Sequence, residues 1–433
     1  MIKDTLKRNK FIRLVYRCLT GKHHLLTLDD INFAQVKQYQ DRCVKRIKQK
    51  QKIVVAFFIS TASKWKYEYL YQLLSADNRF EPIIVIVPMH YWGRKFMVDE
   101  MNHTYEFFKN YNTVKTYNEK NNKFFDVKSK IQPDVIFYSE PYGFVGRQYH
   151  ITNFYKTALC CHVQYAFMAA NTYEIMYNSV FHNLLWKLFA ETDYHKDISC
   201  KFALNKGENV IVTGYPHSDL LIDHKLINHT KNVWRKSTKH QKKIIWAPHH
   251  SIDEEGEFGN FLKSYEYMVE IAKKYKNDIF ITFKPHPNLK PRLENRSDWG
   301  KQKTETYFKL WEEMENTQIM IDDYIDLFLE SDGMIHDCGS FILEYLFTKK
   351  PVIYQHRNNH VITQWNDLAT YALNKVIYKS YTFDDIVDFI DNVILSGNDY
   401  LLSERLNFIT KILPPNNTLA SENIFNYIEK ELK

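Results

Sequence analysis

Residues 53–59 read Ile-Val-Val-Ala-Phe-Phe-Ile, a run of apolar residues with no polar position between them. A strand with one wet face alternates apolar and polar residues, whereas a strand that is apolar throughout is buried on both faces, as in a parallel sheet. Similar short runs recur along the chain, with helical patterns between them, at 82–87, 134–138, 157–161, 210–213, 243–246, 279–283, 319–321, 333–335 and 351–354. This alternation predicts an α/β fold with doubly wound parallel sheets.

A chain of 433 residues exceeds the usual size of a single hydrophobic core, so we expect two domains. The polar and basic stretch 223–243 predicts a linker. We therefore expect Rossmann-like domains over 51–225 and 240–398. A basic helical segment over 1–50 precedes them, and helices over 399–433 pack back on the first domain. Within these parts the apolar spacing predicts helices at 96–111, 261–276, 382–396, 400–413 and 420–432.

Positive charge is concentrated at the start of the chain. Residues 1–52 hold fourteen Lys or Arg against four Asp, a net charge of +10, whereas the whole chain carries +7 and the remainder therefore −3. A basic segment on a near-neutral body indicates an anionic partner, and interspersed apolar residues favour a membrane surface. The alternative is a solvated helix that packs on its own domain. Nucleic acid is not expected as a partner, because no nucleic-acid-binding motif follows.

The remaining composition indicates a protein of the cytoplasm. No apolar run approaches the roughly 18 residues that span a bilayer, and the start of the chain lacks the pattern of a signal peptide. We therefore expect a cytoplasmic protein, peripheral on the inner face of the cell membrane. The six Cys show no metal-ligand spacing, and Cys160-Cys161 is expected to be a reduced, buried pair.

Residues 331–355 predict a strand, a turn, a helix and a second strand. Ser340 stands where the helix begins, and the free N–H groups of a helix start can bind an anionic group such as a phosphate. Gly339 would let that backbone approach a ligand closely. Glu344 follows one turn later on the same face, where an acid can meet ribose hydroxyls. The alternative is an ordinary turn with a capping Ser.

Two other strands of the second half also end in polar clusters. His249-His250-Ser251 follow one strand, and Lys284-Pro-His286-Pro follow the next. Ligands of open α/β sheets bind beyond the carboxyl ends of the strands, so three such ends predict a shared site. His249 and His250 could instead cap a loop, and Lys284 could be a solvated surface residue. In the first half only His162, followed by Val and Gln164, holds a comparable position.

Taken in order, these segments resemble the CDP-glycerol glycerophosphotransferase family, the teichoic acid primases and polymerases. The similarity is carried by Trp246-Ala-Pro248, Lys284-Pro-His286-Pro287, the turn 336–340 and Thr213-Gly-Tyr-Pro216-His-Ser-Asp219. His217 stands where the family has Arg, and Cys338-Gly339 replace the usual Tyr-Ser. His162 matches the family's His-Gly-Thr-Pro element without its Gly, Thr or Pro. The resemblance implies a glycosyltransferase B fold, in which an acceptor domain and a nucleotide-donor domain face each other across a cleft.

The resemblance also implies a reaction. An acceptor hydroxyl of a lipid-linked glycan, teichoic acid or capsule would attack the β-phosphorus of CDP-glycerol or a related CDP-polyol, and CMP would leave. An alcohol needs a base near neutral pH, and His162 is the candidate; its alternative role is a partly buried His at a strand end.

The donor would be bound by residues of the three strand ends, and no metal or other cofactor is expected because no carboxylate pair has metal-ligand spacing. The predicted donor-binding residues are His249, Lys284, His286, Asp337, Gly339, Ser340 and Glu344.

Two other functions fit the same pattern. One is a glycosyltransferase or epimerase of the same fold that uses a nucleotide sugar, since that class also has a Gly-Ser turn before a helix. The other is a non-catalytic, membrane-associated scaffold of a polymer-export machine. Three retained polar strand ends argue against the scaffold.

Overall fold

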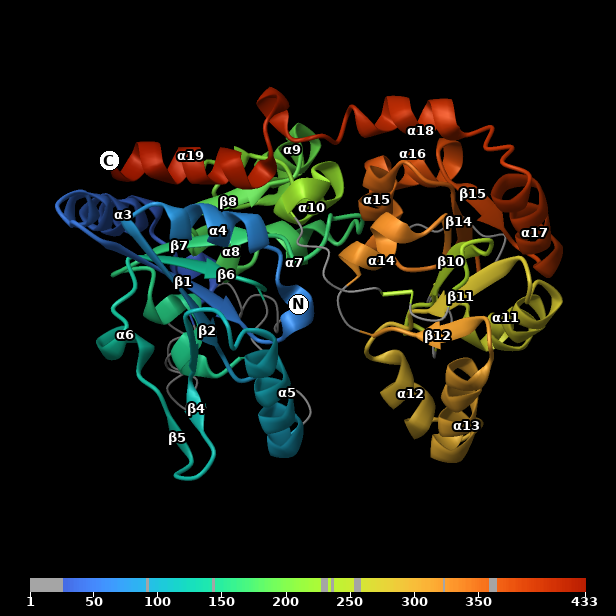
Figure 1. Ribbon diagram of the computed structural model, residues 1–433. Helices are drawn as coiled ribbons and strands as arrows, with labels where there is room; N and C mark the ends of the chain where they lie inside the picture. Colours follow the sequence, from blue (N-terminus) through green and yellow to red (C-terminus); the bar gives the residue numbers. More distant parts are fainter. Residues whose placement is uncertain are drawn as a thin grey trace, which may run out of the picture.

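The protein is described by a computed structural model that covers residues 26–90, 93–141, 145–226, 233–234, 237–252, 258–321, 324–357 and 364–433. Two parallel sheets, each with helices on both faces, lie side by side (Figure 1). The strand orders are β3-β2-β1-β6-β7-β8-β9 and β12-β11-β10-β13-β14-β15. In both sheets the first strand in sequence lies inside, with earlier crossovers on one side and later ones on the other, which is the Rossmann arrangement. The predicted fold class is confirmed.

The first sheet consists of β1 (Ile53–Ile59), β2 (Phe80–Ile86), β3 (Thr113–Lys115), β6 (Val135–Tyr138), β7 (Leu159–Val163), β8 (Lys187–Ala190) and β9 (Val210–Val212). The second consists of β10 (Lys242–Ala247), β11 (Ile279–Phe283), β12 (Thr317–Ile319), β13 (Gly333–His336), β14 (Val352–Gln355) and β15 (Tyr378–Ser380). A small hairpin pairs β4 (Tyr117–Asn118) with β5 (Lys123–Phe124). The apolar runs thus predicted most strands of the two sheets, whereas β3, β8 and β15 were missed because each is short and contains a Lys.

The longer helices are α3 (Phe33–Lys48), α4 (Glu68–Ala76), α5 (Gly93–Phe107), α9 (Asp193–Phe202), α11 (Phe261–Lys274), α13 (Gly300–Glu313), α16 (Asp367–Lys375), α18 (Leu402–Ile409) and α19 (Ala420–Leu432). The shorter ones are α6 (Val127–Lys130), α7 (Tyr173–Tyr177), α8 (Val180–Leu184), α10 (Asp219–Ile222), α12 (Leu289–Asn295), α14 (Ile325–Glu330), α15 (Phe341–Glu344) and α17 (Phe383–Asp388). The predicted helix 382–396 is α17 continued by a π-helical turn, Phe389–Leu395. Among the described residues, no helix is both long and apolar enough to cross a membrane.

The side chains of β1 show why an apolar run specifies a central strand. Phe57 and Ile59 belong to the core on one face of the sheet, and Ala56 and Phe58 to the core on the other. Successive side chains of a strand point to opposite faces, so a strand covered on both sides can have no polar position. The pair Cys160 and Cys161 on β7 is split between the same two cores, and both are free thiols, as predicted.

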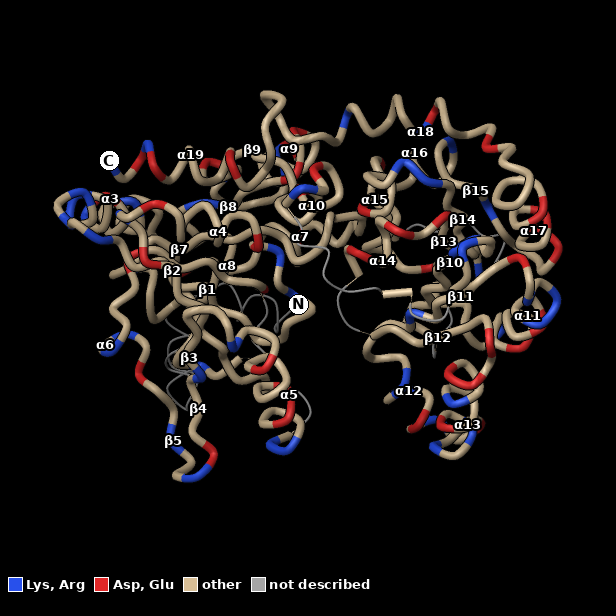
Figure 2. Tube along the Cα trace, in the orientation of Figure 1, with Lys and Arg blue, Asp and Glu red and all other residues tan. Residues whose placement is uncertain are grey.

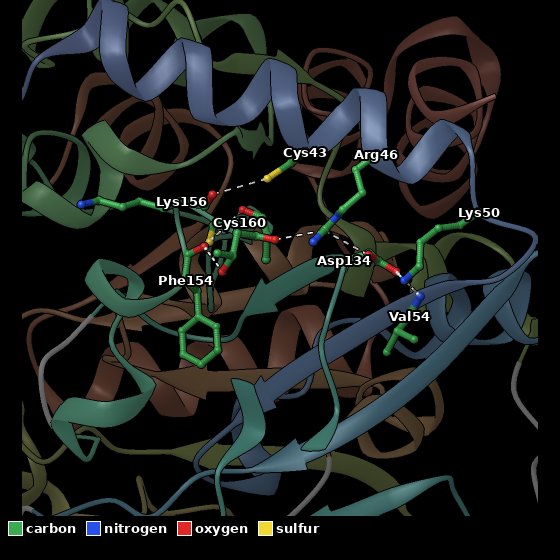
Figure 3. A network of polar contacts seen from close by, with 10 residues as sticks. Cys43, Arg46, Lys50, Val54, Asp134, Phe154, Lys156 and Cys160 are labelled. Atoms are coloured by element: carbon green, nitrogen blue, oxygen red, sulfur yellow. Dashed lines mark hydrogen bonds and ion pairs between the residues drawn. The ribbon is translucent and has the colours of Figure 1, made fainter. Parts of the chain in front are cut away.

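Part of the predicted basic segment packs on the first domain. Helix α3 buries Val36, Cys43 and Ile47. Asp134, at the entry to β6, accepts hydrogen bonds from Arg46 (3.1 Å), Lys50 (2.5 Å) and the N–H of Val54 (3.1 Å). Figure 3 shows this network between α3 and the sheet. For 33–48 the structure therefore shows the alternative, a helix packed on its own domain, although Figure 2 shows that Lys and Arg still line it. Residues 1–25 lie outside the described part of the chain.

The end of the chain crosses from the second domain to the first. Helix α18 is held on the second domain by Arg405, whose buried guanidinium donates to Lys349 O (3.1 Å) and pairs with Asp399. Helix α19 then lies along α3 and α4 (Figure 1). The buried carboxylate of Asp219 accepts the N–H groups of Ala420 and Ser421, each at 2.7 Å, and so caps α19. The predicted domain boundaries remain a proposal.

The predicted linker is more structured than its composition indicates. Trp234 is buried although its neighbours in sequence are polar, because its ring packs on Phe280 at a centroid distance of 6.0 Å. The ammonium group of Lys243 lies over the same ring. This part of 223–243 therefore contributes to the core of the second domain. The average polarity of the stretch does not reveal a single buried Trp.

Candidate functional site

Three polar segments meet at the carboxyl edge of the second sheet. Strand β10 pairs with β11 on one side and with β13 on the other, all in parallel. The segments that follow these strands therefore leave the sheet at the same edge. The backbone N–H of His249 donates to Asp337 Oδ1 at 2.5 Å, which ties the first segment to the third. The predicted meeting of the three strand ends is thus observed.

Three imidazoles stack at this edge, and we call His249, His250 and His286 the histidine cluster. The ring centroids are 4.2 Å apart for His249–His250, 4.2 Å for His250–His286 and 4.9 Å for His249–His286. The three side chains are half-buried. Arg292 donates from Nη1 to the carbonyl of His250 at 3.2 Å, which adds a fixed cation beside the cluster.

The environment of the cluster keeps His249 and His286 neutral. Burial lowers the pKa of both His249 and His286 well below 6.5, and the neighbouring imidazoles and Arg292 lower it further. The N–H of Ser251 points at His249 Nδ1 (3.2 Å), and the N–H of Asn288 donates to His286 Nδ1 (3.1 Å). A ring nitrogen that accepts an N–H carries no proton, so in both rings the proton belongs on Nε2. These two histidines are therefore arranged to donate a hydrogen bond while neutral.

The same cluster is the candidate for a metal site. Within the described ranges it is the one group of three or more His, Cys, Asp or Glu whose ligand atoms lie close together, all within 4.8 Å. Imidazoles suit a transition metal, yet a metal ligand at Nε2 needs its proton on Nδ1. The N–H donated to His286 Nδ1 opposes that tautomer. The residues therefore fit an anionic ligand better than a metal ion.

Lys284 is buried rather than solvated, with an exposed fraction of 6%. Its ammonium group donates to the carbonyl of Ile321 at 3.2 Å and lies 5.3 Å from the ring centre of Tyr324. Its charge also contributes to the low pKa of His286. A cation held inside the protein beside neutral imidazole donors is suited to an anionic group.

The turn after β13 was predicted to bind an anionic group, but its residues mostly contact other parts of the protein. Asp337 is fully buried and its second carboxylate oxygen accepts the N–H of Asn260, so it fixes two loop backbones; burial raises its pKa to about 7. Gly339 faces Trp365, since an added Cβ would lie 2.6 Å from the indole ring. Ser340 precedes an α-helix of only four residues and its side chain makes no cap. Ser340 therefore holds the N-cap position of the alternative without its side-chain hydrogen bond, and the short helix weakens the expected anion site.

Glu344 lies toward the first domain. It is fully buried and Oε1 accepts the hydroxyl of Tyr324 at 2.7 Å. The same oxygen is 3.7 Å from Nε2 of His217, which follows β9 of the first sheet. This carboxylate therefore joins the two domains, a position that sequence spacing could not show.

His162 lies inside the first domain, at the end region of β7. It is fully buried, Nδ1 is 2.8 Å from the carbonyl of Tyr138 and Nε2 is 3.4 Å from Gln164 Oε1. Burial lowers its pKa to about 4. The structure thus shows a buried His at a strand end, and the role of His162 as the base stays a prediction.

Comparison with known proteins decides the family. Residues 175–430 match the family described as CDP-Glycerol:Poly(glycerophosphate) glycerophosphotransferase, which is more than half of the chain. The chain belongs to this family. The predicted family, a family of transferases, is confirmed.

Among individual relatives, the teichoic acid ribitol-phosphate polymerase TarL of Staphylococcus aureus is 27% identical to this chain over 210 residues. The matched segment covers 44% of this chain and 33% of TarL. The minor teichoic acid biosynthesis protein GgaB of Bacillus subtilis is 27% identical over 220 residues, 47% of this chain and 21% of GgaB. The chain thus spans a third or less of the length of these two relatives.

Solved structures show the same fold. The wall teichoic acid polymerase TagF (H548A) superposes with a TM-score of 0.58 at 13% identity and covers 92% of this chain and 98% of its own. A UDP-GlcNAc 2-epimerase from Neisseria meningitidis gives a TM-score of 0.54 at 17% identity, over 88% of this chain and all of its own. Both support the two-domain glycosyltransferase B architecture.

Sequence reasoning missed Lys66, Arg292 and Tyr324, which reach the site from separate elements. It named His217 only as a departure from the family pattern, whereas the structure places it beside Glu344. No sequence signal marks these positions, because each depends on contacts between elements that are distant along the chain.

Proposed function

We propose that the protein transfers glycerol phosphate or a related polyol phosphate from a CDP-linked donor to a hydroxyl of a cell-surface glycan, releasing CMP. The observation that carries the proposal is the histidine cluster beside Lys284, at the edge of the sheet where ligands of such folds bind. The family match supports the reaction class. The names of the matched relatives, which refer to teichoic acid, support a teichoic acid or capsule acceptor, lipid-linked or polysaccharide.

The cluster supplies the electrostatics that phosphoryl transfer needs. The Nε2–H groups of His249 and His286 donate to oxygens of the donor diphosphate, and Lys284 compensates its charge. Because these groups are fixed by backbone contacts, they need no reorganisation as negative charge builds on the leaving CMP. In this proposal Glu344 meets the ribose, and the turn of Asp337, Gly339 and Ser340 lines the same site.

The acceptor oxygen forms a bond to the β-phosphorus and loses its proton to a base of the protein. The bond from the β-phosphorus to the bridging oxygen breaks, and CMP leaves with that electron pair. The polyol phosphate is then joined to the acceptor through a phosphodiester.

A donor screen tests the proposal. The full chain is incubated with CDP-glycerol, CDP-ribitol or UDP-sugars and with lipid-linked or capsular oligosaccharides, and nucleotide release is measured. CMP release that requires both a CDP-polyol and an acceptor is the expected result. Turnover of a UDP-sugar alone would favour the glycosyltransferase or epimerase alternative, and binding of no nucleotide would favour the scaffold.

Two further parts of the proposal have their own tests. We propose that no metal is required, so CMP release should be unchanged after dialysis against a chelator; activity that is lost and then restored by a divalent cation would make the histidine cluster a metal site. We also propose that the protein is peripheral on the cytoplasmic face of the membrane, where its basic start meets anionic lipid.

A further inference from the structure

A buried polar cluster joins the two domains, and we call Lys66, His217, Tyr324 and Glu344 the interdomain cluster. Lys66 follows β1 and His217 follows β9, both in the first sheet. In the second domain, Tyr324 directly precedes α14 and Glu344 is the last residue of α15. Lys66 Nζ donates to the hydroxyl of Tyr324 at 2.9 Å, and that hydroxyl donates to Glu344 at 2.7 Å. The ring of His217 stands edge-on to that of Tyr324, with centroids 5.3 Å apart.

His217 is the member of this cluster whose ring nitrogens make no hydrogen bond within the described residues. Its exposed fraction is 6%, and neither ring nitrogen hydrogen-bonds to any residue of the described ranges. Other buried imidazoles vary. His195 has both nitrogens engaged, at 2.8 Å from Thr192 Oγ1 and 2.9 Å from the carbonyl of Met168, whereas His182 and His336 each have a buried Nε2 without a partner in the described part of the chain but do not lie between the domains beside a carboxylate. A buried polar group without a partner needs an explanation, and a ligand that arrives later is one.

We infer that His217 is the base that takes the proton from the acceptor hydroxyl, with Glu344 holding it in place. This inference rests on the proposed function. The acceptor O–H bond breaks as the oxygen bonds to the β-phosphorus, and the proton passes to Nδ1 of His217. Nε2 faces Glu344 Oε1 at 3.7 Å, so the carboxylate lies where it stabilises the imidazolium that forms. The proton is lost to solvent when the product leaves.

The charges around His217 agree with this role. Burial and the nearby Lys66 lower the pKa of His217 well below 6.5, so the ring is neutral and able to accept a proton at neutral pH. The histidine comes from the acceptor domain and its carboxylate from the donor domain. The pair is therefore complete only when the domains are in contact, which would restrict proton removal to the closed, donor-loaded state.

The sequence at position 217 departs from the family in a way that agrees with this role. His217 occupies the place where the family's Gly-x-Pro-Arg-x-Asp element has Arg, a residue that cannot act as a base near neutral pH. The Asp of that element, Asp219, is used to cap α19 and is not available to the reaction. The replacement of Arg by His at position 217 therefore places a group that can accept a proton where the family has one that cannot.

The test compares two substitutions with a matched control in the full chain. His217→Gln keeps the polar shape but cannot take a proton, and His217→Ala leaves space for added imidazole. His224→Gln, at an exposed His of the next turn, is the control. We measure CMP release with acceptor, and separately the affinity for CDP-glycerol by calorimetry.

His217→Gln should lower turnover by about 10²- to 10⁴-fold with donor affinity almost unchanged, and imidazole should restore part of the activity of His217→Ala. Turnover close to wild type in His217→Gln would overturn the inference, and so would a loss of donor affinity as large as that of Lys284→Ala. If wild type itself releases no CMP from any CDP-polyol, the proposed function has failed rather than this inference.

Discussion

Replacing His286 by Asn separates the binding role of the imidazole from its structural role. His286 Nδ1 accepts the N–H of Asn288 at 3.1 Å, just before α12 begins. An Asn side chain commonly accepts the N–H two residues later, so His286→Asn keeps this contact. It removes only the Nε2–H that we propose donates to the donor phosphate. The fold should therefore survive while binding weakens.

The size of the effect follows from the type of bond. A hydrogen bond to a charged group contributes about 1.5–3 kcal/mol, and a tenfold change in affinity corresponds to about 1.4 kcal/mol. We expect the affinity for CDP-glycerol to fall by roughly 10- to 150-fold. The unfolding free energy should change by less than about 1 kcal/mol, because no apolar contact of the core is lost.

Calorimetric titration with CDP-glycerol and denaturant unfolding together measure both quantities. His240→Asn, at an exposed His of the same domain, is the control and should change neither. Donor affinity within about twofold of wild type in His286→Asn would refute the reasoning. So would equal losses of stability and affinity, since the histidine would then act through the fold.

Three further predictions concern other parts of the chain. His162→Gln should destabilise the protein by about 1–3 kcal/mol in denaturant unfolding, because the carbonyl of Tyr138 loses its partner, with turnover retained; abolished turnover at normal donor affinity would return the role of base to His162. Removal of residues 1–25, which hold seven Lys or Arg against one Asp, should abolish flotation with anionic vesicles, since each basic residue near the surface contributes about 1 kcal/mol; binding that persists, or that ignores salt, would contradict the electrostatic account. Burial lowers the pKa of His336 to about 3, below its unfolded value, so its stabilising contribution is present above about pH 6.5 and is lost as the pH falls toward 3. The stability of wild type relative to His336→Gln should therefore decline over that window, by up to about 1.4 kcal/mol per pH unit, and a constant difference would contradict this.

The sequence by itself determined the architecture and one half of the site. The run 53–59 has no polar position and 279–283 has only the small Thr282. Strands of this kind are typical where both faces of a sheet are covered, so the parallel sheets and their crossovers followed. Polar residues directly after such strands must emerge at one edge of the sheet. The positions of His249, Lys284 and His286 along the chain were therefore enough to place them together.

Only the tertiary structure decided what each side chain of the site contacts. Asp337 has the sequence position of a ligand-binding residue, but two backbone N–H groups from other loops occupy its carboxylate. His162 follows a strand like the other candidates, yet the layer that covers the sheet buries it. His217 and Glu344 are 127 positions apart and meet only because the two domains pack together. Contacts of this kind depend on how separate elements are packed, and a local pattern of residues carries no information about them.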